Sequence, residues 1–262
     1  MNLTEQNYFS AEAAAHYMSQ SQFKDFDQCA ARAMAILRGD ISDEKEAYIE
    51  GRYFEAIICG KREEFEAEYA DQILSSRGAT KGEPKANFRS VIASAEAFMR
   101  QPAFSDIVSR CEQQKILTGE IAGVPFKCKL DFFDPKTLSE WDSKCMRDFK
   151  RLYDDGECHY ASWFFVRGYH YQAAISRELI RQNFGDVGTC GLIAATKEVV
   201  PDVAWIVFDD SVLDNALEIV QTFAPTYAAV KLGEIEPERC ERCDWCRQTK
   251  LLTEPEQILV YE

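Results

Sequence analysis

The chain has 262 residues, of which 46% are hydrophobic, enough for one sizeable core or one large domain with a small appendage. Acidic residues outnumber basic ones by 44 to 30, and the net charge of −14, taken alone, argues against a nucleic-acid partner, which requires a basic surface. No run of about 18 apolar residues is present, and the N-terminus lacks a basic segment followed by an apolar run, so we expect no membrane helix, no signal peptide and a cytoplasmic location.

Helices are predicted over the first hundred residues. A pattern that starts with serine caps and continues with apolar residues at helical spacing covers 19–38 and ends at Gly39. Further helical patterns follow at 44–58, 62–75 and 86–100. The first part of the chain is therefore expected to consist of helices, with a loop at 75–84.

The pattern changes to strands at residue 115. Three strands in a meander are predicted over 115–144, with turns at Ala122–Gly123 and Asp134–Pro135. The elements expected after the meander are a long helix at 159–183, two strands around Val200–Pro201 and a late helix at 211–232. This order predicts an α/β (α+β) fold, with one mixed sheet flanked by helices.

Acidic residues stand inside the predicted meander, where a strand should bury apolar side chains. Residues two apart on a strand share a face, so Asp142 and Lys144 point the same way, with Glu140 in line behind them. Asp131 ends the neighbouring strand and is expected beside Asp142. Two carboxylates and an ammonium group at a strand end suit a magnesium site, in which the lysine orients a metal-bound water or offsets developing charge.

An acid two residues before a lysine is a weak signal by itself, because solvated surfaces contain many such pairs. The chain has five, at Asp43/Lys45, Glu83/Lys85, Asp134/Lys136, Asp142/Lys144 and Asp148/Lys150. Only the fourth pair lies in a predicted strand one hairpin after another acid, and Asp134 is expected to serve the turn.

An acid that ends one strand, a hairpin, and then D/E-x-K on the next strand resembles the core of the PD-(D/E)XK nucleases. Asp131 and Asp142-Ser143-Lys144 match this pattern. Longer stretches, including "EGRYFEAIICGKREEFEAEY", "LTGEIAGVPFKCKLDFFD" and "CDWCRQTK", are similar over nearly the full length to phage-type exonucleases related to RecE. The resemblance implies a restriction-endonuclease-like core within a single nuclease domain over 1–262. It would comprise N-terminal helices to about residue 100, a catalytic core to about residue 235 and a cysteine-rich tail at 236–262.

The resemblance also implies roles for individual residues. Asp131 and Asp142 would bind magnesium or manganese, the Ser143 backbone carbonyl would be a further ligand, and Lys144 would be the catalytic lysine. Family members place a histidine or an acid on an early helix, and here that position is Glu55. Without the resemblance, Glu55 would be interpreted as a glutamate on the surface of a helix. Two metal ions would sit between Glu55, Asp131 and Asp142, one activating water and the other stabilising the leaving oxygen.

The helix after the lysine carries a glutamine in this family, often followed four residues later by tyrosine. Gln172 fits this position and is expected to position the metal site or a DNA phosphate, but Ser176 stands where the tyrosine would be. The neighbouring aromatics Tyr169 and Tyr171 are expected to pack.

Three cysteines, Cys240, Cys243 and Cys246, are spaced three apart in "CERCDWC", a spacing at which thiolates commonly bind one metal centre. Some RecB-like nucleases resemble this arrangement, and in them one early and three late cysteines hold a [4Fe–4S] cluster; Cys29 would be the early ligand. Those proteins usually have C-x2-C-x5-C, and this chain has C-x2-C-x2-C. An iron–sulfur cluster, a zinc ion and free thiols therefore all stay open, and a metal would tie the tail to the first helix.

The resemblance implies a magnesium-dependent exonuclease that resects linear double-stranded DNA, with a single-strand annealing protein as its partner in phage recombination. A ring-shaped homo-oligomer with a basic channel would reconcile DNA binding with the acidic total charge. A second hypothesis is a non-catalytic module that binds DNA ends or a partner, and a third is an enzyme acting on RNA or a nucleotide. The intact Asp131, Asp142 and Lys144 favour the first.

Overall fold

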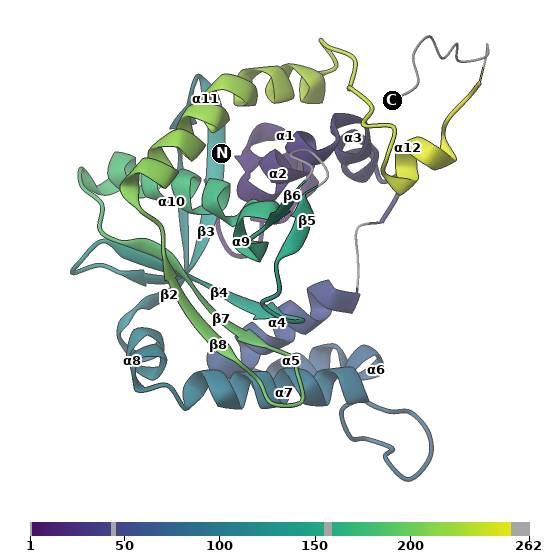
Figure 1. Cartoon of the computed structure of the whole chain (residues 1–262), viewed down its shortest axis with the longest axis vertical. Coiled ribbons are helices and arrows are strands. Elements are labelled where there is room, and N and C mark those ends of the chain that lie inside the picture. The colour runs from purple at the N-terminus through teal and green to yellow at the C-terminus, as the bar shows by residue number, and fades with distance from the viewer. Residues whose placement is uncertain (1, 43–45, 155–158, 253–262) are drawn as a thin grey trace.

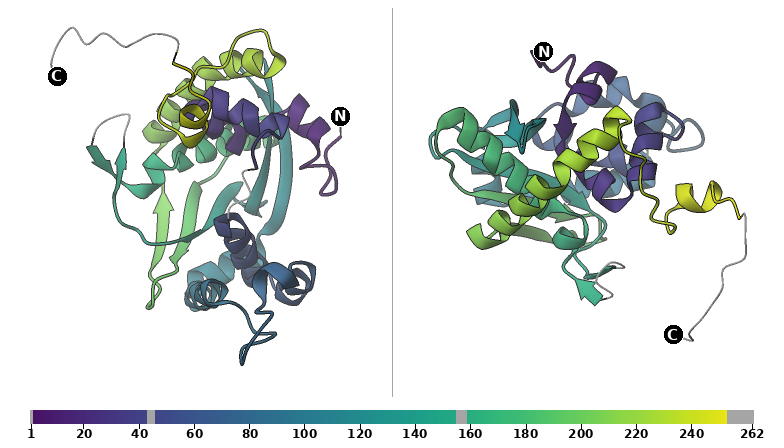
Figure 2. Two further views of the ribbon diagram at one scale, coloured as in Figure 1. Left: turned by 90° about the vertical axis from the view of Figure 1, so that its right-hand side faces the viewer. Right: turned by 90° about the horizontal axis from the view of Figure 1, so that it is seen from above.

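A mixed sheet of six strands divides the molecule into two helical layers (Figure 1, Figure 2). The computed structural model describes residues 2–42, 46–154 and 159–252, so the pair Asp43/Lys45 lies outside the described residues. The strands of this sheet are β1 Met18–Ser19, β2 Glu112–Ile121, β3 Val124–Asp134, β4 Ser139–Met146, β7 Cys190–Thr196 and β8 Val203–Val207. Their order is β1-β3-β4-β7-β8, with β2 paired to β3. The predicted mixed sheet flanked by helices is confirmed.

The predicted meander of β2, β3 and β4 is confirmed, and its two turns differ in chemistry. Ala122 and Gly123 join β2 to β3 with φ of 50° and 78°, the two positive values that a tight two-residue hairpin requires. At the second turn, the Asp134 carboxylate accepts hydrogen bonds from the Lys136 N–H at 3.0 Å and the Thr137 hydroxyl at 2.9 Å. Asp134 therefore serves the turn, as expected.

β3 has a gap along one of its edges. One edge pairs with β2 along nearly its whole length. The other edge pairs with β1 at Phe126 and Lys127 and with β4 only from Phe132 onward. β4 continues beyond that point in parallel pairing with β7. The chain thus leaves residues 128–131 of β3 unpaired on this edge, in the middle of a sheet.

Each face of the sheet is covered by helices that bury their own hydrophobic cluster. On one side, the cluster includes Phe23, Phe126, Leu179 and Val220, contributed by α2 Gln20–Gln28, β3, α10 Tyr169–Phe184 and α11 Asp210–Leu232. On the other side, the cluster includes Tyr53, Phe88 and Phe132, with α4 Glu46–Ile58, α7 Ala86–Met99 and α8 Pro102–Arg110. Burial of these side chains on both faces is the main source of stability for a sheet of this kind.

Three predicted helices are interrupted, because single residues adopt non-helical backbone. Cys29 is extended, with φ −169° and ψ 106°, and separates α2 from α3 Ala30–Arg38, which ends at Gly39 as predicted. Tyr69 separates α5 Arg62–Glu68 from α6 Ala70–Ile73. Gly168, with φ 65°, separates α9 Trp163–Val166 from α10 within the helix predicted at 159–183. The start of that prediction is wrong, because residues 159–161 form strand β6, which pairs with β5 Leu152–Asp154. The remaining elements that sequence patterns did not predict are α1 Ala11–His16, α8 and α12 Asp244–Gln248.

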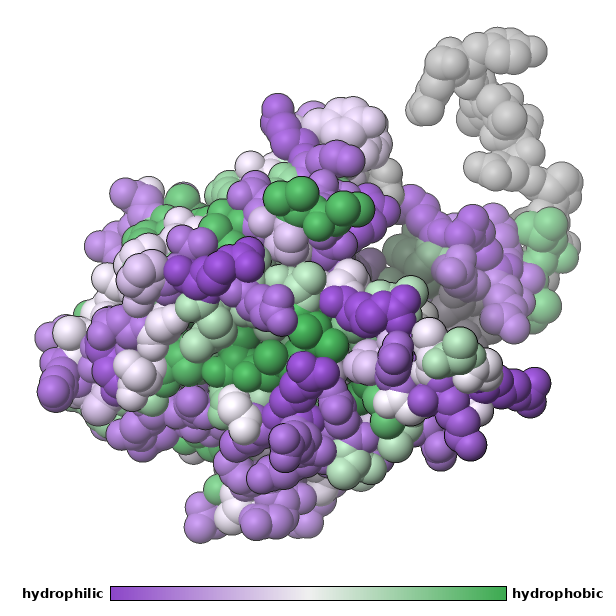
Figure 3. Space-filling view, turned by 90° about the horizontal axis from the view of Figure 1, so that it is seen from below, coloured by the Kyte–Doolittle hydropathy of each residue, from purple (hydrophilic) through white to green (hydrophobic). Residues whose placement is uncertain are grey.

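The predicted strands around Val200–Pro201 and the late helix are confirmed as β7, β8 and α11. Within the described part of the chain, no helix is both long and apolar enough to cross a membrane. Seen from the side of α7, the surface is mixed, with hydrophobic groups gathered near the middle and hydrophilic groups around them (Figure 3).

Candidate active site

The two acids predicted to lie together are neighbours at the point where β3 and β4 separate. The last pair between these strands is Phe132 with Trp141, and the same antiparallel register brings Asp131 next to Asp142. The Ser143 N–H and hydroxyl donate to Asp131 Oδ2 at 2.9 and 3.0 Å. These bonds fix the Asp131 carboxylate across the gap between the strands.

Lys144 and Gln172 both hold the Asp142 carboxylate. The Lys144 ammonium forms an ion pair with Asp142 Oδ2, and Gln172 on α10 donates to Oδ1 at 2.5 Å. Asp142 is buried and Lys144 is largely so. Gln172 therefore contacts the acid it was expected to serve. Ser176, at the position of the family tyrosine, accepts a hydrogen bond from Gln20 at 2.6 Å.

Glu55 reaches the same place from α4 on the other side of the sheet. Gln114 on β2 donates to Glu55 Oε1 and lies 3.4 Å from Asp131 Oδ1, so it connects the two acids. Gln114 is opposite Asp131 in the β2–β3 register and has φ 57°, a value that is uncommon for a residue other than glycine. Backbone strain of this kind concentrates at functional sites.

The site is electrostatically unbalanced toward negative charge. Burial first, and then the charge of Asp131, raises the pKa of Glu55 to about 8. Burial raises the pKa of Asp142 to about 6 even though Lys144 acts in the opposite direction. Burial acts to lower the pKa of Lys144, but the charges of Asp142, Tyr169 and Asp131 together outweigh it and the net shift is upward, so the ammonium stays charged.

Glu140 adds a further buried carboxyl group to this site. It is 2% exposed, and its Oε2 has no hydrogen-bond partner among the described residues. Burial, followed by the charges of Asp142 and Asp131, raises the Glu140 pKa well above its ordinary value. A carboxyl group in this position is kept neutral behind the two acids that face the gap.

Sequence reasoning missed two side chains of this site. Gln114 could have been found only through its unusual backbone angle, which the sequence does not reveal. Lys24 on α2 lies 3.4 Å from Gln172 Oε1, and its ammonium is over the ring of Tyr169 at 4.9 Å from the centroid. Tyr171 packs against Phe23, as expected for an aromatic beside this helix.

The other described D/E-x-K pairs have ordinary roles. Lys85 donates to the carbonyl groups of Asp71 and Gln72, and Asp148 accepts the N–H of Lys150 at 3.1 Å. Among the described pairs of this type, Asp142/Lys144 alone forms an ion pair within a strand.

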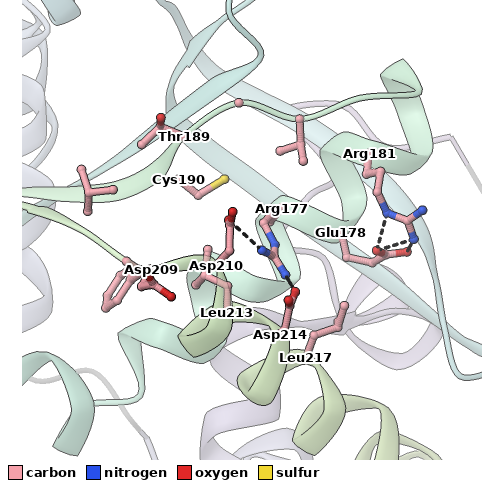
Figure 4. Close-up of a pocket in the computed structure, with 14 residues that line it drawn as sticks. Arg177, Glu178, Arg181, Thr189, Cys190, Asp209, Asp210, Leu213, Asp214 and Leu217 are labelled. Atoms are coloured by element: carbon pink, nitrogen blue, oxygen red, sulfur yellow. Dashed lines mark hydrogen bonds and ion pairs between the residues drawn. The ribbon is translucent and has the colours of Figure 1, made fainter.

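A large pocket lies elsewhere in the molecule, and its charges do not suit the binding of a phosphate group. It has a volume of about 930 Å³ and lies between α10, α11 and the start of β7 (Figure 4). Its cations are already neutralised, because Arg177 pairs with Asp210 and Asp214 and Arg181 pairs with Glu178. A pocket lined by this many acids disfavours a phosphate ligand.

The four cysteines predicted to act together do meet. The Sγ atoms of Cys29, Cys240, Cys243 and Cys246 all lie within 4.8 Å of one another, and α12 packs against α3 at this point. Cys29 Sγ is 3.5 Å from Cys246 Sγ and 3.8 Å from Cys243 Sγ. The N–H groups of Cys243 and Cys246 point at sulfur atoms, at 3.3 and 3.5 Å. Such N–H···S contacts favour thiolates, which are the metal-binding form.

A mixed sheet in which two acids and a lysine meet where two strands separate is the architecture of the PD-(D/E)XK class. Residues 19–249 match the family described as "PDDEXK-like domain of unknown function (DUF3799)", and the chain belongs to this family. The crystal structure of a protein from Eubacterium rectale, described as a "Putative exonuclease", is similar with a TM-score of 0.87 and 33% sequence identity. The alignment covers 98% of this chain and 97% of that one. Among curated proteins, none matches. The fold and the family are those of a nuclease.

Proposed function

We propose that this chain is a magnesium- or manganese-dependent exodeoxyribonuclease that hydrolyses phosphodiester bonds from the ends of linear double-stranded DNA. The observation that carries the proposal is the meeting of Asp131, Asp142 and Lys144 at the separation of β3 and β4 in a PD-(D/E)XK fold. The exonuclease description of the similar protein supports action from an end.

The donor set fits a hard divalent cation. Glu55, Asp131, Asp142 and the Ser143 carbonyl would hold the ion, and all of them offer oxygen. The pKa values of Glu55 and Asp142 are raised, so their ionised forms are poorly stabilised by the protein alone. A bound divalent cation would supply the positive charge that stabilises them. When bound, magnesium lowers the pKa of a coordinated water and stabilises charge on the leaving oxygen.

The protein side chains orient the reactants. Lys144 keeps its proton, so it acts as a fixed positive charge that holds the attacking water and offsets charge on the phosphate. Gln172 fixes the rotamer of Asp142, and Ser143 fixes that of Asp131. Gln114 donates to one oxygen of Glu55, so the other carboxylate oxygen would stay available to a cation.

The four cysteines are proposed to hold a metal centre with a structural role, and two centres have support. A tetrahedral zinc with Zn–S bonds of about 2.3 Å requires sulfur atoms about 3.8 Å apart. The S···S distances of 3.5, 3.8 and 4.0 Å match this. The arrangement of one early and three late cysteines instead supports [4Fe–4S], in which each thiolate binds a different iron and the sulfurs must lie farther apart.

We propose that the enzyme acts in phage recombination, together with a single-strand annealing protein, and that it is active as a homo-oligomer. β8 is an edge strand on which Trp205 and Val207 are more than half exposed, which supports contact with another copy.

The test is degradation of end-labelled linear duplex DNA with magnesium, with EDTA and by the Lys144→Ala protein. We expect loss of DNA only for the wild type with magnesium. DNA that is bound but never cleaved, whatever the metal, would contradict the enzyme and favour the non-catalytic module.

A further inference from the structure

Lys24 places a second positive charge beside the candidate active site, from a distant part of the sequence. Its Nζ lies 4.9 Å from the centre of the Tyr169 ring, and Lys144 Nζ lies 5.0 Å from the same centre. Gln172 joins the two sides, because its amide donates to Asp142 while its oxygen lies 3.4 Å from Lys24 Nζ. Lys24 is thus one side chain removed from a proposed metal ligand.

Among the described residues, Lys24 has no carboxylate in direct contact with its ammonium group. Salt bridges within the described part of the chain include none to Lys24, so no carboxylate there lies within 4 Å of its ammonium. Burial, followed by the charge of Lys144, lowers the Lys24 pKa to about 8, although the charges of Asp142 and Asp25 act in the opposite direction. Two ammonium groups that lie over the same aromatic ring at a half-buried position are stabilised when an anion binds between or beside them.

The position of Lys24 is fixed by contacts that do not involve its ammonium group. Gln20 on the same helix donates to the Gln172 carbonyl at 2.9 Å, and Phe23 is fully buried. A Cβ atom at Gly168 would lie 3.0 Å from Lys24 Cδ, so the glycine leaves room for the lysine stem. A cation held in place before its ligand arrives is what efficient binding of a phosphate requires.

We propose that Lys24 binds the backbone phosphate at the site of cleavage, through a non-bridging oxygen and beside Lys144. The inference rests on the proposed nuclease function and adds a substrate-binding residue to it. In a chain of net charge −14, a local cation of this kind attracts a DNA phosphate to a site that also holds several acids.

The test compares Lys24→Met, Lys24→Arg and the control Lys136→Met, which removes an exposed lysine at the far turn of the β3–β4 hairpin. The first measurement is the affinity for a short duplex in EDTA at several salt concentrations, which does not depend on cleavage. We expect Lys24→Met to weaken binding and to lower the slope of log affinity against log salt by about one, whereas Lys136→Met leaves both unchanged.

The second measurement is kcat and KM for DNA cleavage with magnesium. We expect kcat/KM of Lys24→Met to fall by about tenfold or more, with partial recovery in Lys24→Arg, since a phosphate contact tolerates either cation. Binding with an unchanged salt slope by a Lys24→Met protein of wild-type melting temperature would overturn the inference. Failure of the wild type to cleave, with the slope changed as expected, would contradict the nuclease proposal and leave Lys24 as a phosphate-binding residue.

Discussion

Lys144 is the residue on which the proposed chemistry depends most directly. Lys144→Ala is expected to lower kcat for DNA cleavage by a factor on the order of 100 to 10,000, because it removes a positioned charge at the reacting phosphate. The matched control is Lys150→Ala, which changes another D-x-K lysine outside the site. Cleavage rates measured under saturating magnesium test this, and equal rates for the two variants would contradict the role of Lys144.

Glu55 gives the metal-free protein a pH-dependent stability. Its pKa is raised on folding from 4.5 to about 8, so the folded chain holds this proton more tightly than the unfolded chain. Stability in EDTA is therefore expected to fall as the pH rises above 4.5 and to level off above about 8. Glu55→Gln is expected to flatten part of this dependence. Melting temperatures between pH 5 and pH 8 test the prediction, and a rise in stability over this range would refute it.

Gly168 connects backbone geometry at the start of α10 with the site. Its φ of 65° is costly for other residues by about 1 kcal/mol, and a Cβ there meets the Lys24 stem. Gly168→Ala is expected to lower the melting temperature and to reduce cleavage, because Lys24 is displaced. The control is Gly185→Ala at the other end of α10, which has φ 81° but no atom near its added Cβ. Gly185→Ala should lower the melting temperature but leave cleavage unchanged. Equal loss of cleavage in both variants would contradict the contact between residue 168 and the Lys24 side chain.

The break between α2 and α3 lies at the cysteine cluster, since Cys29 has extended backbone and its Sγ lies within 4.8 Å of those of Cys240, Cys243 and Cys246. Cys29→Ser is expected to lose the bound metal and to lower the melting temperature, whereas Cys111→Ser, outside the cluster, keeps both. Metal analysis of the wild type should find about one zinc or about four irons per chain. A wild type free of both metals would show that the thiols are unoccupied.

The edge strand β8 is the element that we expect to mediate self-association. Val207→Lys, which adds charge to the exposed edge, is expected to lower the molecular mass measured by light scattering. The control is Val200→Lys in the loop between β7 and β8, where the side chain is also exposed to solvent but lies off the edge strand. A wild-type protein that is monomeric at all concentrations would rule out the oligomer.

At the scale of the whole molecule, the acidic total charge and the proposed DNA substrate are compatible because two cations, Lys24 and Lys144, lie among the acids of the candidate site. Other acids lie away from the site, for instance Asp210 and Asp214 along α11. The proposal that 1–262 forms a single nuclease domain stays a prediction, to be tested by whether the chain unfolds in one cooperative transition.

The sequence by itself determined the elements whose patterns are local. The β2–β4 meander, its two turns, the β7–β8 pair and the stop at Gly39 follow from alternation and from turn chemistry, which neighbouring residues decide. Spacing in the sequence also predicted that Asp131, Asp142 and Lys144 lie together and that Cys240, Cys243 and Cys246 act together, whereas Cys29 was predicted only from the resemblance to RecB-like nucleases.

Only the tertiary structure decided which distant residues meet. The helix breaks at Cys29, Tyr69 and Gly168 were not predicted, because apolar periodicity continues through them while packing sets the backbone. Lys24 and Gln114 are ordinary residues in sequence. They belong to the site because α2 packs on α10 and because β2 pairs with β3 opposite Asp131. Contacts between residues far apart in the chain depend on the packing of whole elements, and no short pattern encodes them.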